Sequence, residues 1–348
     1  MFSNPALVAP FAHRPLLPFI ARQVTGWFDV RFFDGFEITT TVAVIAQLIA
    51  VYGLAQHFSK RFAPALIATG VIALSTYNVK FLLHDFYRPD SLAFPLLALA
   101  MWALFRRIDW LVIGTCAVGL LTREFMIIPP VLLCYIYGRE LLVNPRRVGS
   151  WLMLALTIAV TGAAVLAPRL IIDAARSDAA IAQTDALLRV FHPARLLNLV
   201  LVMAAYCLPL AILAGGTRWR TAWDQLAGKR DLLALYCLGV LGLSLIGGTD
   251  LPRFAAYLYI PLVIGLTLLL DDGINGWEVA YLLIAWAVFN RTFSAIPQTD
   301  LDAYLDAYRG YNQRISLVTL WWIVESVGWI LGAWGLKRLI IAFNFRRL

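Results

Sequence analysis

A cluster of ionisable residues interrupts a chain that is otherwise mostly apolar. Residues 84–91 read HDFYRPDS, which places His84, Asp85, Arg88 and Asp90 together. A carboxylate can act as a general base toward an acceptor hydroxyl, and Asp85 and Asp90 are the catalytic candidates. The Arg88 guanidinium can bind a phosphate through its fork of N–H donors, with His84 in a supporting position. The stretch therefore has the residue types for group transfer from an anionic substrate.

Two further polar groups border apolar stretches. Arg123 and Glu124 lie in the sequence TRE, and Asp250 and Arg253 lie in GGTDLPRF. Arg123 and Arg253 join Arg88 as candidates for holding a phosphate, with Glu124 and Asp250 in support. Charged groups at membrane depth cost at least about 2.5 kcal/mol each on insertion scales, so they usually face a cavity or one another. We expect these groups to share one polar cavity.

Each of these features also has a purely structural interpretation. Arg123 with Glu124, and Asp250 with Arg253, can pair to neutralise charge at helix ends. Asp90 can act as a helix N-cap whose carboxylate accepts backbone N–H groups. Paired acids would also suit the oxygen coordination of Mg²⁺ or Mn²⁺, so a divalent cofactor stays open, although the sequence defines no metal site.

The elements that position these residues are predicted to be transmembrane helices. Of the 348 residues, 61% are hydrophobic and 14% are charged, and a soluble domain could not keep so much apolar surface from water. The net charge of +8 fits basic residues beside lipid headgroups and does not require nucleic acid as a partner. A hydrocarbon core of ~30 Å needs about 20 apolar residues per helix. The sequence predicts an all-α, polytopic bundle of about eleven spans, near 42–56, 63–80, 91–106, 109–122, 125–138, 149–168, 197–214, 231–247, 254–270, 277–290 and 315–335.

The distribution of Lys and Arg predicts which side of the membrane each loop occupies. Basic residues concentrate in the short loops HFSKRF, FRRID and YGRELLVNPRR, in TRWRTAWDQLAGKRD and in the C-terminal tail. Such loops are typical of the cytoplasmic side, which predicts a cytoplasmic C-terminus and an outer position for HDFYRPDS. The bundle then covers 42–348, with long outer loops at 169–195 and 291–314. Residues 1–41 contain prolines, arginines and spaced apolar residues, which favours an interfacial amphipathic segment on the outer face.

Four segments of the chain resemble a known family. HRPLLPFIARQV, YRPDSLAFPLLALAMWALFRR, GLLTREFMIIPPVLL and GGTDLPRFAAYLYIPLVIGL resemble the succession of segments in bacterial integral-membrane glycosyltransferases of the GT-C fold, including the relatives of lipid A and rhizobial glycosyltransferases. The resemblance runs over most of the chain and rests on short, degenerate motifs.

The resemblance implies a sugar transferase of the bacterial inner membrane. Its donor would be a polyprenyl-phosphate-linked sugar, and its acceptor a glycan or lipid on the periplasmic face. The family pattern has an acid directly after its first helix, whereas Asp29, Asp34 and Glu37 come later than that pattern expects. Asp90, with Asp85 beside it, falls where a second, assisting acid would be. The resemblance thus implies that the family's first helix is absent from this chain, so that either the start is truncated or a partner subunit supplies the helix.

Two other classes of function compete with this interpretation. One is a non-catalytic membrane subunit of a larger complex. The other is a transporter or lipid flippase, which commonly places ionisable residues near the bilayer midplane and often has repeat symmetry. Here the charges gather toward one rim and no internal repeat is evident, which disfavours transport.

Overall fold

The computed structural model describes residues 14–59, 61–83, 86–172, 193–246, 251–273, 275–292 and 317–345. Every regular element within these ranges is a helix, which confirms the all-α prediction. The chain divides into two compact units, and each is described by itself. The first unit takes its residues from 1–54, 81–186 and 232–243, and the second from 55–80, 187–231 and 244–348.

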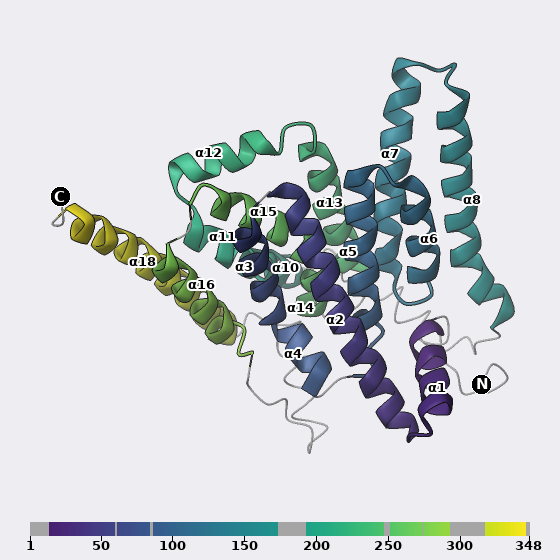
Figure 1. The fold of residues 1–348 in the computed structure, drawn as a ribbon, viewed down its shortest axis with the longest axis horizontal. Helices are drawn as coiled ribbons and strands as arrows, with labels where there is room; N and C mark the ends of the chain where they lie inside the picture. The colour runs from purple at the N-terminus through teal and green to yellow at the C-terminus, as the bar shows by residue number, and fades with distance from the viewer. Residues whose placement is uncertain are drawn as a thin grey trace. The chain divides into compact units, whose positions relative to one another are not determined.

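The first unit is built from long apolar helices and one short amphipathic helix. Helix α5 packs along α6, and α7 packs along α8 as an antiparallel pair (Figure 1). The unit's helices are α1 (Leu16–Phe28), most of α2 (Phe32–Phe58), α5 (Asp90–Arg106), α6 (Asp109–Gly119), the 3₁₀ helix η2 (Glu124–Ile127), α7 (Ile128–Val143), α8 (Val148–Ile171) and the middle of α13 (Arg230–Ile246).

Helix α1 is held by a small apolar core. Leu17 and Ala21 of α1 are fully buried and pack with Phe36 of α2. Phe86, which precedes α5, and Leu92, in the first turn of α5, pack against the same three residues. This core therefore fixes the chain on both sides of Asp90 relative to α1 and α2.

A glycine permits the close approach of α1 to α2. A Cβ atom on Gly35 would lie 2.6 Å from the carbonyl oxygen of Ala21, so only a residue without a side chain fits there. Helix α2 already begins at Phe32, ten residues before the predicted span 42–56. The expected boundary between residues 41 and 42 thus falls inside a continuous helix.

The second unit has a buried central helix. Helix α15 (Tyr259–Asp271) is buried along most of its length and packs against α3 (Phe62–Ala73). Helices α16 (Gly276–Phe289) and α18 (Leu317–Phe345) lie side by side (Figure 1). The other helices of the unit are most of α4 (Thr76–Leu83), α10 (Pro193–Tyr206), α11 (Leu208–Leu213), α12 (Gly216–Gln225), α14 (Leu251–Ala255) and the 3₁₀ helix η3 (Ala256–Leu258).

Within the part of the chain that the structure describes, four helical stretches are long and apolar enough to cross a membrane. They are Phe32–Phe58, Glu124–Val143, Val148–Ile171 and Arg253–Asp271. Several helices also expose large apolar side chains, among them α8 through Trp151, Leu152 and Ile158, and α18 through Trp321, Val324 and Leu331. Apolar surface of this kind is stable in lipid and unfavourable in water. These helices indicate a membrane protein, and eleven spans remain a prediction.

Candidate functional site

The first turn of α5 presents Asp90 to the interior of the first unit. Pro89 precedes the helix, and its fixed φ suits a helix start. The Ser91 hydroxyl donates to the Arg88 carbonyl at 2.9 Å, and the Thr40 hydroxyl of α2 donates to the Phe86 carbonyl. These bonds hold the YRPDS turn against α2. The Asp90 carboxylate lies at the positive end of the α5 dipole, where negative charge is favoured.

A tight turn after α6 presents Arg123. The backbone N–H groups of Thr122 and Arg123 both donate to the Gly119 carbonyl, at 2.8 and 3.0 Å, and the Thr122 hydroxyl donates to the same oxygen. Arg123 itself is extended, with φ −151° and ψ 145°. A Cβ on Gly119 would lie 2.7 Å from Cγ of Met126, so glycine lets the next turn fold back closely. The extended backbone at Arg123 separates α6 from η2 and α7.

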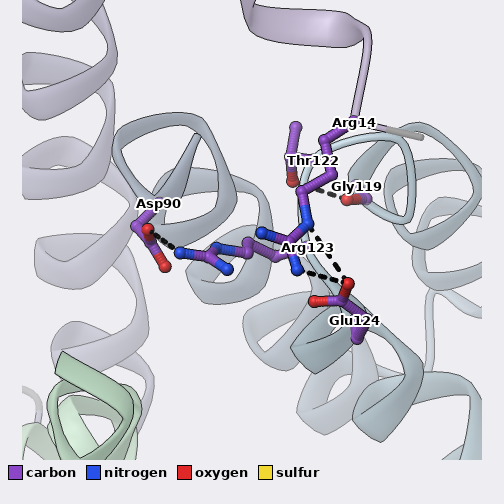
Figure 2. Close-up of polar contacts among 6 residues, drawn as sticks. All are labelled: Arg14, Asp90, Gly119, Thr122, Arg123 and Glu124. Atoms are coloured by element: carbon purple, nitrogen blue, oxygen red, sulfur yellow. Dashed lines mark hydrogen bonds and ion pairs between the residues drawn. The ribbon is translucent and has the colours of Figure 1, made fainter. Parts of the chain in front are cut away.

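Arg123 and Asp90 form a buried ion pair. The Arg123 Nη2 donates to Asp90 Oδ2 at 2.5 Å, and the two side chains are 4% and 0% exposed (Figure 2). Removing one partner from such a pair leaves an uncompensated buried charge, which is strongly unfavourable. The pair therefore couples the start of α5 to the turn after α6, across 33 residues of sequence.

A second ion pair lies next to the first and reaches solvent. Arg14 donates to Glu124 Oε1 from Nη2 at 2.6 Å and from Nε at 3.1 Å. The Arg14 side chain is 11% exposed, whereas that of Glu124 is 50% exposed. The Leu16 N–H donates to the Leu121 carbonyl and so fixes the start of α1 beside this turn. Of the two carboxylates in the cluster, Glu124 is therefore the exposed one.

The positive charges of Arg14 and Arg123 interact. Burial lowers the pKa of Arg14, and the nearby positive charge of Arg123 lowers it further, while Glu124 opposes the shift. Figure 2 shows the Arg14 guanidinium beside the Arg123 side chain. The Arg14 guanidinium suits a phosphate, because it offers a planar set of N–H donors and has some exposed surface. In this structure Asp90 and Glu124 balance the charge of the two arginines.

These contacts differ from two of the structural interpretations of the sequence. Arg123 and Glu124 do not pair with each other, since each has a partner from another part of the chain, Asp90 and Arg14 respectively. Asp90 is not an N-cap: the capping position is Pro89, and the Asp90 carboxylate bonds to Arg123.

Of the other predicted site residues, two make contacts with neighbouring rings and three lie outside the described residues. The Arg88 guanidinium stacks over the ring of Tyr87, 5.8 Å from its centroid. Arg253 belongs to the second unit, where its guanidinium lies 5.5 Å from the centroid of the Phe254 ring. His84, Asp85 and Asp250 lie outside the described residues.

Arg14 is the member of the cluster that sequence reasoning missed. It lies 110 residues from Glu124, and no periodicity links the two positions. The available signal was an arginine directly before Pro15, at the start of an amphipathic segment. Among the described residues, no group of three or more His, Cys, Asp or Glu side chains could hold a metal ion.

Comparison with known proteins adds no assignment. No protein-family model, curated protein or solved structure matches the chain. The class that the fold supports is a helical membrane protein, and the function must be inferred from the cluster itself.

Proposed function

We propose that the chain is a membrane glycosyltransferase that takes a sugar from a polyprenyl-phosphate carrier and transfers it to a glycan or lipid acceptor on the periplasmic face. The observation that carries this proposal is the cluster of Arg14, Arg123, Asp90 and Glu124, which gathers two guanidiniums and one half-exposed carboxylate at the ends of apolar helices.

The two ion pairs suit different tasks in such a reaction. Asp90 has no exposed surface and is bonded to Arg123, so in the proposed reaction it is a positioning residue that orients the Arg123 guanidinium. Glu124 reaches solvent and can accept a proton from an acceptor hydroxyl. The general-base role therefore moves from Asp90 to Glu124.

The donor phosphate would bind beside Arg14. The Nη2 and Nε atoms of Arg14 both donate to one oxygen of Glu124, so this interaction is a fork that a phosphate oxygen could share or replace. Because the lipid carrier brings negative charge, the neighbouring positive charges of Arg14 and Arg123 would then have a further counterion. Apolar helices beside the cluster would accommodate the polyprenyl chain.

The test is sugar transfer in proteoliposomes with radiolabelled sugars on polyprenyl-phosphate carriers. We expect wild type to transfer label to an extractable glycan or lipid, and Glu124→Gln to lower the rate by about 10²-fold or more, as for loss of a general base. Glu37→Gln is the matched control, since Glu37 is an exposed carboxylate of the same unit and we expect it to leave the rate unchanged. Equal rates in wild type and Glu124→Gln would remove Glu124 from the mechanism. Absence of transfer from every donor would favour a non-catalytic membrane subunit.

A further inference from the structure

A cavity in the second unit combines positive charge with an apolar wall. Its volume is about 270 Å³, near the lower end for small-molecule sites. Arg218 of α12, Glu278 of α16 and Lys337 of α18 line it, and Ile340 and Ile341 of α18 form an apolar part of its lining. Three separate helices thus contribute to one site, and this cavity lies outside the cluster described above.

The charged groups of the cavity are held in place and carry a net positive charge. Arg218 donates to both oxygens of Glu278, from Nη1 at 3.2 Å and from Nη2 at 3.0 Å. The Lys337 Nζ lies 4.0 Å from Glu278 and donates to the Ala214 carbonyl at 3.2 Å. Two cations and one carboxylate leave a formal charge of about +1, and an arginine and a lysine together have eight N–H donors, more than these bonds use.

Two helix N-termini add to this field. Helix α12 has ten residues and starts directly after Gly215, which lines the cavity and offers no side chain to cap the helix. Helix α16 has fourteen residues and starts after Asn275, which also lines the cavity and whose side-chain oxygen accepts the Trp277 N–H at 3.0 Å. The N-terminus of a helix carries partial positive charge and favours an anion. Together with Arg218 and Lys337, these termini make the cavity attractive to a phosphate group.

The surroundings of the cavity favour a lipid as the source of that phosphate. Helix α12 exposes Trp219 and Trp223, each at 48%, and the Arg230 guanidinium stacks over Trp223 at 4.6 Å. Exposed tryptophans next to basic residues on an amphipathic helix are typical of the interface between membrane and water. Ile341 is 55% exposed beside the cavity and offers a surface for an acyl chain.

We propose that this cavity binds the phosphate of an anionic phospholipid headgroup, with Arg218 and Lys337 as the cationic ligands and Ile340 and Ile341 against the first part of the acyl chain. The inference rests on the second unit alone and does not depend on the glycosyltransferase proposal.

Native mass spectrometry of the full chain in a neutral detergent tests this site, with phosphatidylglycerol, phosphatidylcholine or inorganic phosphate as the probe. We expect one tightly retained phosphatidylglycerol molecule and no comparable retention of phosphatidylcholine. Lys337→Gln should weaken that binding by about tenfold, as expected for losing one charge-assisted hydrogen bond. Arg338→Gln is the matched control, because Arg338 is the next residue of α18 and stacks on Trp334 at 4.9 Å.

A second variant keeps the test decisive if Lys337→Gln fails to fold. Thr217→Glu adds a carboxylate to the exposed first turn of α12, where negative charge favours the helix, while it repels an anion in the cavity. We expect it to fold and to lose phosphatidylglycerol. Equal binding of both lipids, or binding that neither variant weakens, would overturn the proposal. Full displacement of the lipid by millimolar inorganic phosphate would replace the headgroup with free phosphate as the ligand.

Discussion

Two arginine–carboxylate pairs, one in each unit, differ mainly in their access to solvent. Arg123 and Asp90 are sealed, with 4% and 0% of their side chains exposed, whereas Arg218 and Glu278 are 24% and 10% exposed and line a cavity. The chemistry of the two pairs is the same. Burial therefore separates a pair that can only position its neighbours from a pair that can still receive a ligand.

The sealed pair should be the most sensitive to substitution. Arg123→Met would leave the Asp90 carboxylate buried without its guanidinium, and we expect a loss of about 3–5 kcal/mol in the free energy of unfolding. Chemical denaturation in detergent measures this loss. The double variant Asp90→Leu, Arg123→Met replaces both charges by apolar groups and should recover most of the stability. If Arg123→Met alone cost less than about 1 kcal/mol, the pair would not be sealed in the way its exposure indicates.

Substitution in the cavity pair Arg218–Glu278 should cost less stability than substitution in the sealed pair, and it should strengthen lipid binding. Glu278→Gln leaves Arg218 and Lys337 next to a cavity that can hydrate them, so we expect a loss of only about 1–2 kcal/mol in the free energy of unfolding. The same change raises the formal charge of the cavity by one, so phosphatidylglycerol should bind more tightly. Denaturation and native mass spectrometry on one preparation measure both effects. Weaker lipid binding in Glu278→Gln would show that the carboxylate is needed to place the cations.

A pair with a largely exposed arginine sets the lower limit of the comparison. Arg31 and Asp34 form an ion pair at 3.0 Å in which the arginine side chain is 87% exposed. Water screens such a pair, and the hydrogen bond to Asp34 only raises the pKa of an arginine that is already charged. Arg31→Gln should therefore unfold at the same temperature as wild type. A clear drop would mean that solvent access does not rank these pairs.

Several helices were readable from the sequence, because long apolar stretches are typical of helices that contact lipid or the protein interior. The predicted stretches 91–106 and 149–168 correspond to α5 and α8 within three residues at either end. The start of α2 was not readable, since Asp34 and Glu37 interrupt the apolar pattern. Both belong to the first two turns of a helix that continues through them.

The pairing of charges was readable only in part. Hydropathy predicted that Asp90 and Arg123 border apolar helices at one face, and they are in contact. It did not predict Arg14 with Glu124, or the convergence of Arg218, Glu278 and Lys337. Those contacts depend on how distant helices pack, which no local pattern encodes. Glu278, an acid in the first turn of an otherwise apolar helix, was the available signal for the second of these groups.

The most direct test of the proposed donor site is the thermal unfolding of the detergent-purified protein with undecaprenyl phosphate, in wild type, Arg14→Gln and Lys337→Gln. Each variant is compared with its own ligand-free midpoint, so differences in basal stability cancel. We expect the lipid to raise the midpoint of wild type and of Lys337→Gln, and to raise that of Arg14→Gln clearly less, because only the second-unit cavity would then bind it. An equal rise in Arg14→Gln, or no rise in wild type, would contradict a phosphate site at Arg14.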